Sequence, residues 1–213
     1  MNLHTSSTTT NDETEKDVKK EIPVEIEPIT GVSFPIKLTD GKELKAIGLR
    51  KKHVFGLSLK IYSFGIYADN QKLMGVLKSP KAMKEMYEMV VDSGVGITVR
   101  MVIVFGHLTM SMVRKYFNEG LGAAIRKLGP GKNNDLTKRI LGEATDDIKL
   151  TPGSEIEITC LPGYVLETKV RGKVVNKFES ETLCKAYIYM YLGDDPLDKQ
   201  AKENFGMSLL SLS

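Results

Sequence analysis

Apolar and polar residues alternate along residues 22–68, a spacing typical of β-strands joined by tight turns. Val24 and Ile26 alternate with glutamates, and Asp40-Gly41 lies between two further apolar alternations, which is a strong hairpin signal. A second reversal of the chain is predicted near Gly56, between two long apolar segments. The first part of the chain is therefore predicted to be antiparallel β-structure.

The spacing of apolar residues then changes to a helical period in three places. Residues 72–91 carry this period, and Pro80 is predicted to divide them into two short helices. Residues 109–128 carry one apolar stripe with most of their cations away from it, which predicts a longer helix. A further short helix is predicted over residues 136–144.

The remaining elements complete the pattern of a mixed protein. Ser180 is a suitable N-cap for a helix that ends at Gly193, and Asp195-Pro196 is predicted to start another helix that runs to Gly206. Further strands are predicted over residues 97–105, 155–160, 164–170 and 174–178. Strands, helices, strands and helices in this order predict an α+β domain, in which a large antiparallel sheet packs against a layer of helices. Residues 1–21 are predicted to be a disordered tail, because residues 1–20 are rich in Ser, Thr, Asn and charge, and residues 22–213 are predicted to form one domain.

Composition and charge exclude several classes of function. The 213 residues include 30 basic and 27 acidic residues, a near balance that gives a net charge of +3 and argues against nucleic-acid binding. No apolar run approaches the length of a membrane-spanning helix, so membrane insertion is not expected. The oligomeric state is left open.

The residues that most often carry chemistry show no catalytic or metal-binding spacing. Cys160 and Cys184 both fall in apolar stretches and are expected to be buried free thiols. The three histidines lie far apart, so no metal site is predicted. The segment Gly129-Pro130-Gly131-Lys132 lacks the remaining residues of a phosphate-binding loop, and no Gly-x-Ser-x-Gly motif occurs. No catalytic residue and no cofactor are predicted.

Arg50 and Tyr62 form the strongest candidate site. Each lies six residues from Gly56, so an antiparallel pair with its reversal at that glycine would place them opposite each other. Opposed side chains on one face have Cβ atoms roughly 5 Å apart. A guanidinium and a phenol could then converge on one small anion, and a carboxylate fits the planar guanidinium best.

Several short motifs, in order, carry a resemblance to a known family. Gly48-Leu49-Arg50 and the segment 61–68 resemble two strands of the chalcone isomerase fold. The likeness continues in Leu108-Thr109, in Pro152-Gly153-Ser154 and in Tyr191-Leu192-Gly193, and it covers roughly residues 32–205. The resemblance implies an open-faced sandwich of one large sheet and a helical layer. The family contains isomerases that close a flavanone ring and relatives that bind fatty acids without catalysis.

The resemblance also implies roles for individual positions. The isomerases share an arginine that matches Arg50, and they place a threonine, a tyrosine and an asparagine around the flavonoid. Those three positions hold Tyr62, Val113 and Gly120 here, and Cys184 stands at one of two further polar positions. Valine has no hydroxyl and glycine has no side chain, so the polar array of the isomerases is missing.

The resulting hypothesis is a non-catalytic carrier of fatty acids in the chloroplast stroma. Arg50 and Tyr62 would bind the carboxylate, and candidates for the wall of the apolar cleft are Phe64, Val113, Phe117 and Cys184. Two alternatives remain open at this point. One is a chalcone–flavanone isomerase, and the other is a non-catalytic partner of flavonoid-pathway enzymes.

Overall fold

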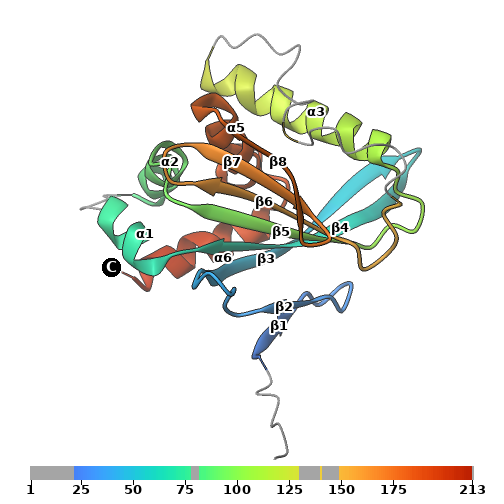
Figure 1. Cartoon of the computed structure of the whole chain (residues 1–213), viewed down its shortest axis with the longest axis horizontal. Coiled ribbons are helices and arrows are strands. Elements are labelled where there is room, and N and C mark those ends of the chain that lie inside the picture. Colours follow the sequence, from blue (N-terminus) through green and yellow to red (C-terminus); the bar gives the residue numbers. More distant parts are fainter. Residues whose placement is uncertain (1–21, 78–81, 130–139, 141–148, 213) are drawn as a thin grey trace, which may run out of the picture.

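A six-stranded antiparallel sheet forms the centre of the protein (Figure 1). The computed structural model describes residues 22–77, 82–129, 140 and 149–212. Each strand pairs with the next one along the chain, in the order β3 (Glu43–Val54), β4 (Leu57–Ala68), β5 (Ile97–Ile103), β6 (Glu155–Leu161), β7 (Val165–Val170) and β8 (Lys173–Glu179). Two short strands, β1 (Val24–Ile26) and β2 (Ser33–Pro35), form a separate pair.

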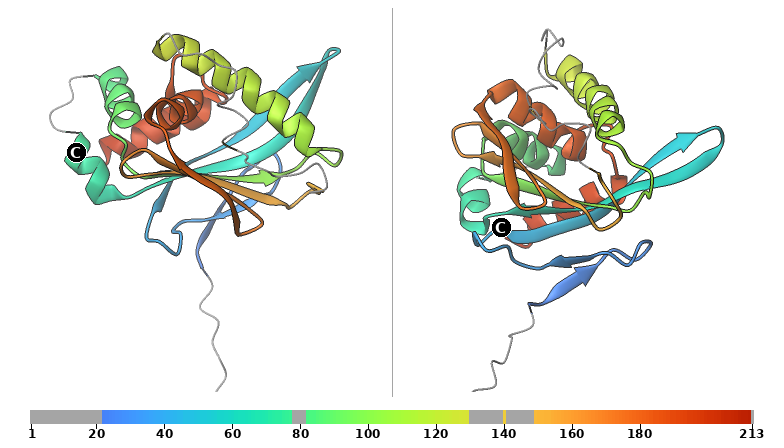
Figure 2. Two further views of the ribbon diagram at one scale, coloured as in Figure 1. Left: turned by 45° about the horizontal axis from the view of Figure 1, so that its top comes forward. Right: turned by 45° about the vertical axis from the view of Figure 1, so that its right-hand side comes forward.

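Helices cover one face of this sheet, and the β1–β2 pair lies on the opposite side (Figure 2). The helices are α1 (Asn70–Val76), α2 (Met83–Asp92), α3 (Met110–Leu128), α5 (Glu181–Leu192) and α6 (Lys199–Leu210). The predicted α+β open-faced sandwich is thus confirmed. The helix predicted over residues 136–144 lies outside the described residues except for Ile140, and so does the predicted tail over residues 1–21.

Side-chain caps fix where the helices begin. The Thr109 hydroxyl accepts a hydrogen bond from the Met112 backbone N–H at the start of α3. Ser180 caps α5 in the same way, as its position in the sequence predicts. The division of residues 72–91 into two helices is also observed, since α1 ends at Val76 and α2 begins at Met83.

The last helix differs from its prediction at both ends. It begins at Lys199 rather than at Asp195-Pro196, because Asp198 is the residue whose carboxylate accepts the Ala201 N–H. The helix also continues through Gly206 to Leu210. A Cβ at Gly206 would lie 2.2 Å from the Tyr87 hydroxyl oxygen, so this glycine permits close packing of α6 on α2 and is not a stop signal.

Asp198 also anchors α6 to the open edge of the sheet. The second oxygen of its carboxylate accepts the Leu49 backbone N–H at 2.9 Å. Leu49 lies in β3, which is the edge strand of the sheet, and unpaired edge groups need such a partner when they are covered. This contact fixes the strand directly beside Arg50.

A β-bulge in the β3–β4 hairpin sets which side chains face the helices. From the turn, Val54 pairs with Leu57 and Lys51 pairs with Lys60, but Arg50 then pairs with Tyr62. Ile61 is the extra residue, and its carbonyl oxygen accepts two backbone N–H groups from the chain after β5, at 3.1 and 3.2 Å. A bulge of this kind changes the phase of alternation along a strand.

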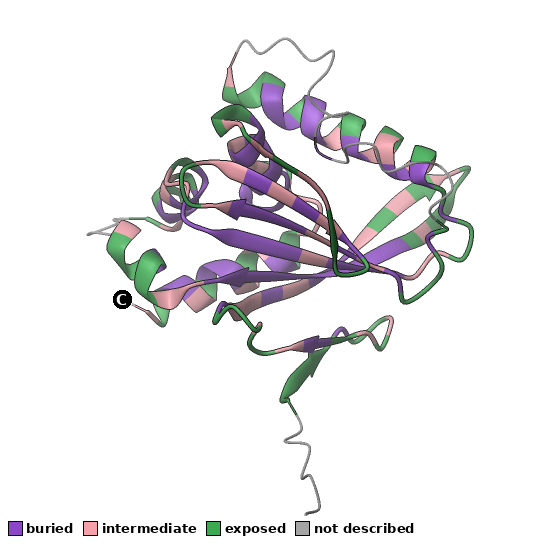
Figure 3. Cartoon of the chain, viewed as in Figure 1, coloured by how far each residue is buried: buried purple, intermediate pink, exposed green. Residues whose placement is uncertain are grey.

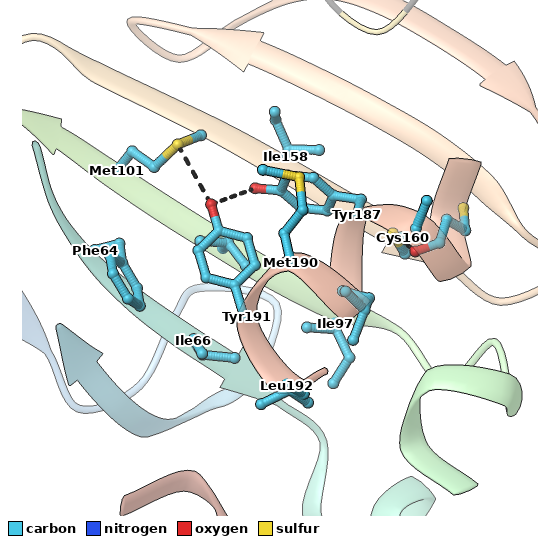
Figure 4. Close-up of a cluster of buried hydrophobic side chains, with 14 of the residues drawn as sticks. Phe64, Ile66, Ile97, Met101, Ile158, Cys160, Tyr187, Met190, Tyr191 and Leu192 are labelled. Atoms are coloured by element: carbon cyan, nitrogen blue, oxygen red, sulfur yellow. Dashed lines mark hydrogen bonds between the residues drawn. The ribbon is translucent and has the colours of Figure 1, made fainter. Parts of the chain in front are cut away.

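The core lies between the helix-facing side of the sheet and the helices (Figure 3). Phe64 of β4 packs edge-on against Tyr191 of α5, with ring centroids 5.1 Å apart (Figure 4). Tyr187 and Tyr191 are likewise almost completely buried. These aromatic residues hold α5 against the centre of the sheet.

Candidate functional site

An apolar cleft lies between the sheet and the first half of α3, near the start of the projecting β3–β4 hairpin. Strands β3 to β6 supply its floor, α3 covers it, and α5 and the segment before α6 close one side. The residues that line it are Arg50, Lys52, Ile61, Tyr62, Met101, Ile103, Leu108, Val113, Tyr116, Phe117, Ile156, Met190 and Leu197. All but two of these side chains are apolar or aromatic.

Arg50 and Tyr62 lie opposite each other on β3 and β4, as the sequence predicts. Arg50 is half-buried, and no carboxylate in the described part of the chain forms an ion pair with it. A half-buried guanidinium in an apolar setting retains its charge and favours an anionic partner. The site therefore presents, at the edge of an apolar cavity, a cation that has no direct ion pair among the described residues and only a longer-range attraction to Glu119.

The Tyr62 phenol is buried, with 8% of the residue exposed. Burial raises its pKa, although a hydrogen bond with the Tyr191 side chain and the positive charge of Arg50 act in the opposite direction. A raised pKa keeps the phenol neutral at physiological pH, so its O–H can donate a hydrogen bond. Arg50 and Tyr62 together offer one charged and one neutral donor to an anion.

Two further tyrosine hydroxyls, those of Tyr187 and Tyr191, lie in the core near this pair. The Tyr191 hydroxyl lies 3.4 Å from the Tyr187 hydroxyl and donates toward the Met101 sulfur at 3.9 Å (Figure 4). Burial raises the pKa of Tyr187 and of Tyr191 well above the usual value. The three phenols are therefore neutral, and Tyr187 and Tyr191 belong to the core beside the cleft without lining it.

A second cation, Lys52, lies beside the same cleft. Its ammonium group forms an ion pair with Glu119 of α3 and lies 5.1 Å from the centre of the Tyr116 ring. The hydrogen bond from Lys52 holds the pKa of Glu119 below its usual range, against a smaller effect of burial. This ion pair, called the Lys52–Glu119 bridge below, ties the hairpin to α3 across the opening of the cleft.

The cleft is narrow in this structure. Its cavity volume is about 20 Å³, close to the size that one water molecule needs. A wider groove of about 420 Å³ adjoins it and shares Arg50, Lys52, Met190 and Leu197. A ligand with a long apolar part would therefore have to separate α3 from the hairpin.

The four predicted wall residues divide into two pairs. Val113 and Phe117 line the cleft from α3. Phe64 does not line it, because its ring is covered by Tyr191 and 1% of the residue is exposed. Cys184 does not line it either, because it is buried against β6, where the Cys160 thiol donates to its carbonyl oxygen at 3.7 Å.

Lys52 and Tyr116 were not predicted as site residues, although the sequence contains a signal for each. Lys52 follows Arg50 by two residues, and alternate residues of a strand share a face. Tyr116 lies three residues after Val113, which places both on one side of a helix. The sequence alone did not show the β-bulge in the β3–β4 hairpin, and so it did not show which face of the hairpin lies toward α3.

The positions that hold polar residues in isomerases do face this region. Val113 lines the cleft and Gly120 lines the adjoining groove. At Gly120 a Cβ would lie 2.8 Å from the terminal methyl of Met190, so the methionine fills the space in which a larger side chain would lie. Neither position supplies a hydrogen-bond donor or acceptor from its side chain.

Other kinds of site have no support in the described ranges of the chain. No group of three or more His, Cys, Asp and Glu side chains there could hold a metal ion. No helix among those residues has the length and apolar character needed to cross a membrane.

The protein is an α+β fold in which an antiparallel sheet lies under a helical layer. A basic group at the edge of an apolar cleft is typical of the class of proteins that bind small molecules. Comparison with known proteins identifies the family. The sequence profile described as "Chalcone isomerase-like" matches residues 27–205, and the chain belongs to this family.

Individual relatives cover most of the chain. It is 49% identical over 206 residues to "Chalcone isomerase-like protein 1" of Humulus lupulus, which covers 92% of this chain and 96% of that protein. It is 33% identical over 198 residues to "Fatty-acid-binding protein 1" of Arabidopsis thaliana, covering 88% of this chain and 71% of that protein. A crystal structure of a fatty-acid-binding protein from Arabidopsis thaliana superimposes with a TM-score of 0.83 and 32% identity, over 89% of this chain and 98% of the other.

Proposed function

We propose that this protein binds fatty acids without catalysis, with the carboxylate held by Arg50 and Tyr62 and the alkyl chain beneath α3. The observation that carries the proposal is the placement of these two donors directly opposite each other at the edge of an apolar cleft. A carboxylate can accept a hydrogen bond from the phenol while it pairs with the guanidinium.

The two parts of the ligand would contribute differently. Each methylene group removed from water stabilises the complex by about 0.8 kcal/mol, so the chain supplies most of the affinity. The head group fixes the orientation, because an unpaired carboxylate would be costly to bury away from the two donors. The apolar residues of α3 and of strands β4 to β6 match the needs of the alkyl chain.

Entry of the ligand requires the cleft to widen. The Lys52–Glu119 bridge is partly exposed at both ends, and such ion pairs contribute little to stability. Breaking it costs little and frees α3 to move away from the hairpin. Methionines 101 and 190 line the same cleft, and their flexible side chains can rearrange around an inserted chain.

The names of two relatives support this ligand class, since "Fatty-acid-binding protein 1" and "Fatty-acid-binding protein 2" of Arabidopsis thaliana are 33% and 28% identical to this chain. The missing polar groups at Val113 and Gly120 support a non-catalytic role. The test is titration calorimetry with saturated fatty acids of increasing length, together with mass spectrometry of small molecules extracted from the purified protein. Absence of measurable heat at every chain length, with no co-purified acid, would refute the proposal.

A second candidate function is a non-catalytic partner of flavonoid-pathway enzymes. The observation in its favour is the 49% identity to a protein named chalcone isomerase-like, which exceeds the identity to the fatty-acid-binding relatives. Retention of such enzymes in a pull-down, combined with failure to bind any fatty acid, would favour this candidate. Turnover of a chalcone well above its spontaneous rate, followed by absorbance, would instead indicate an isomerase.

A location in the chloroplast stroma belongs to the same proposal. It is supported by the family resemblance alone. A fluorescent fusion of the full-length protein, imaged with a stromal marker, tests it. Fluorescence that fills the cytosol and leaves the plastids dark would refute this part of the proposal.

A further inference from the structure

The β3–β4 hairpin extends beyond the rest of the sheet and beyond α3 (Figure 2). Its outer part, residues 51–60 and called the hairpin tip below, consists of two paired strand ends joined by a two-residue turn at Phe55 and Gly56. Both turn residues have positive φ, 49° and 79°. Most residues of the tip are exposed, as the colouring of Figure 3 shows.

The most prominent apolar group of the tip is Phe55. Phe55 is completely exposed, and Leu57 beside it is 67% exposed. The first position of such a turn favours Asn, Asp or Gly, because these residues adopt positive φ with little strain. Phenylalanine there is unfavourable for the turn and gains nothing from the core, so its presence points to a contact outside the chain.

Cations surround this apolar point. Lys51 and Lys60 are directly opposed on the two strands, an arrangement that destabilises a hairpin by itself. His53 follows on the same face, two residues from Lys51. Neither of the two lysines has a carboxylate partner within the described chain. The chain contains five Lys and Arg residues and no acidic residue between Glu43 and Asp69.

We propose that the hairpin tip docks on the surface of an anionic lipid bilayer, with Phe55 and Leu57 entering the headgroup region and Lys51 and Lys60 beside the lipid phosphates. Aromatic and leucine side chains flanked by lysines are the composition that binds membrane interfaces. A bilayer matches the observations better than a folded partner protein does. The apolar area is one ring and one leucine at the end of a projecting arm, too small for the core of a stable protein–protein interface.

The docked position has a consequence for the cleft. Lys52 belongs to the hairpin tip and also lines the cleft, so docking brings the opening of the cleft to the bilayer surface. A ligand could then pass between membrane and protein over a short path. This consequence rests on the proposed function, whereas the docking itself does not depend on what the cleft holds.

Co-sedimentation with vesicles tests the docking. The probes are vesicles of phosphatidylcholine alone and vesicles in which about a third of the lipid is phosphatidylglycerol, at low salt, where electrostatic attraction is least screened. The test variants are Phe55→Asn, whose new side chain suits the turn, and the double variant Lys51→Gln/Lys60→Gln. The controls are Met207→Ser and Lys72→Gln/Lys173→Gln, which change exposed residues elsewhere on the surface.

We expect the unsubstituted protein to sediment with the anionic vesicles and not with the neutral ones. The partition coefficient should fall about thirtyfold in the double lysine variant and at least about tenfold in Phe55→Asn, while both controls match the unsubstituted protein. Phe55→Asn should keep its thermal stability and its fatty-acid affinity in solution, which separates failure of docking from failure of the proposed function.

Three results would overturn the inference. They are absence of sedimentation with anionic vesicles, equal sedimentation with neutral ones, and equal losses in the control variants. The first would exclude a lipid bilayer as the surface that the hairpin tip contacts.

Discussion

Replacement of Arg50 by glutamine is the perturbation that most sharply probes the carboxylate site. The substitution removes the charge but keeps a polar side chain of moderate length at a half-buried position. Since no carboxylate of the described chain pairs with Arg50, its loss leaves no buried acid without a partner. The fold should therefore remain intact while the binding of an anion is lost.

The magnitude follows from the kind of contact that disappears. A hydrogen bond to a charged group contributes about 1.5–3 kcal/mol, which corresponds to about a tenfold to 150-fold loss of affinity. The methyl ester of the same fatty acid carries no charge, and its affinity should change by much less. The difference between acid and ester thus isolates the charge of Arg50 from effects on the shape of the cleft.

Titration calorimetry with the acid and its methyl ester measures both values on the same preparations. Arg126→Gln is the matched control, because Arg126 is an exposed arginine near the end of α3 and does not line the cleft. Affinity for the acid that is unchanged in Arg50→Gln would refute the assignment. An equal loss for acid and ester would show that Arg50 shapes the cleft and does not bind the carboxylate.

Four further predictions follow from other contacts. Breaking the Lys52–Glu119 bridge with Glu119→Gln should raise both the association and the dissociation rate of a fluorescent fatty acid in stopped-flow experiments, and unchanged rates would contradict its role as a closure. Because Lys52 lowers the pKa of Glu119, the bridge stays formed at pH values below the usual pKa of a glutamate and is lost as the pH falls through the lowered pKa. Fatty-acid exchange should therefore accelerate only in acid, and Glu119→Gln should abolish this pH dependence. Gly206→Ala should destabilise the protein by about 1–3 kcal/mol in urea unfolding through the clash with α2, whereas Gly75→Ala, where a Cβ meets nothing within 4 Å, should be neutral or stabilising. The neighbouring Cys184 thiol and burial raise the pKa of Cys160, so native protein should react with a thiol reagent only as fast as it unfolds, and rapid labelling would show an opening of the core.

The antiparallel fold could be predicted because its signals are local. Alternation defined the strands, the cap at Ser180 was predicted from the sequence, and the helical period starting at residue 109 agrees with the cap observed at Thr109. The limits of α6 could not be predicted, since Gly206 ends no helix when its missing side chain makes room for Tyr87. In the sequence, such a glycine cannot be told from a glycine that ends a helix. The two cases differ only in whether a residue distant in the sequence, here Tyr87, packs against the glycine.

The pairing of Arg50 with Tyr62 was predicted correctly, but on incomplete grounds. The turn is centred between Phe55 and Gly56, and a regular hairpin from that turn would place Arg50 opposite Ile61. The bulge at Ile61 shifts the pairing by one residue and brings Tyr62 across. Two backbone N–H groups of a distant segment fix that bulge, so the residues near the turn contain no signal for it.

In the proposed complex, the cleft beneath α3 holds the alkyl chain of an acid whose head group reaches Arg50 and Tyr62. A crystal structure of the protein with a saturated long-chain fatty acid tests this most directly. We predict one carboxylate oxygen within hydrogen-bond distance of the Arg50 guanidinium, the other near the Tyr62 hydroxyl, and the chain between α3 and the sheet. Ligand density at another place, or a carboxylate that points to solvent away from both residues, would contradict it.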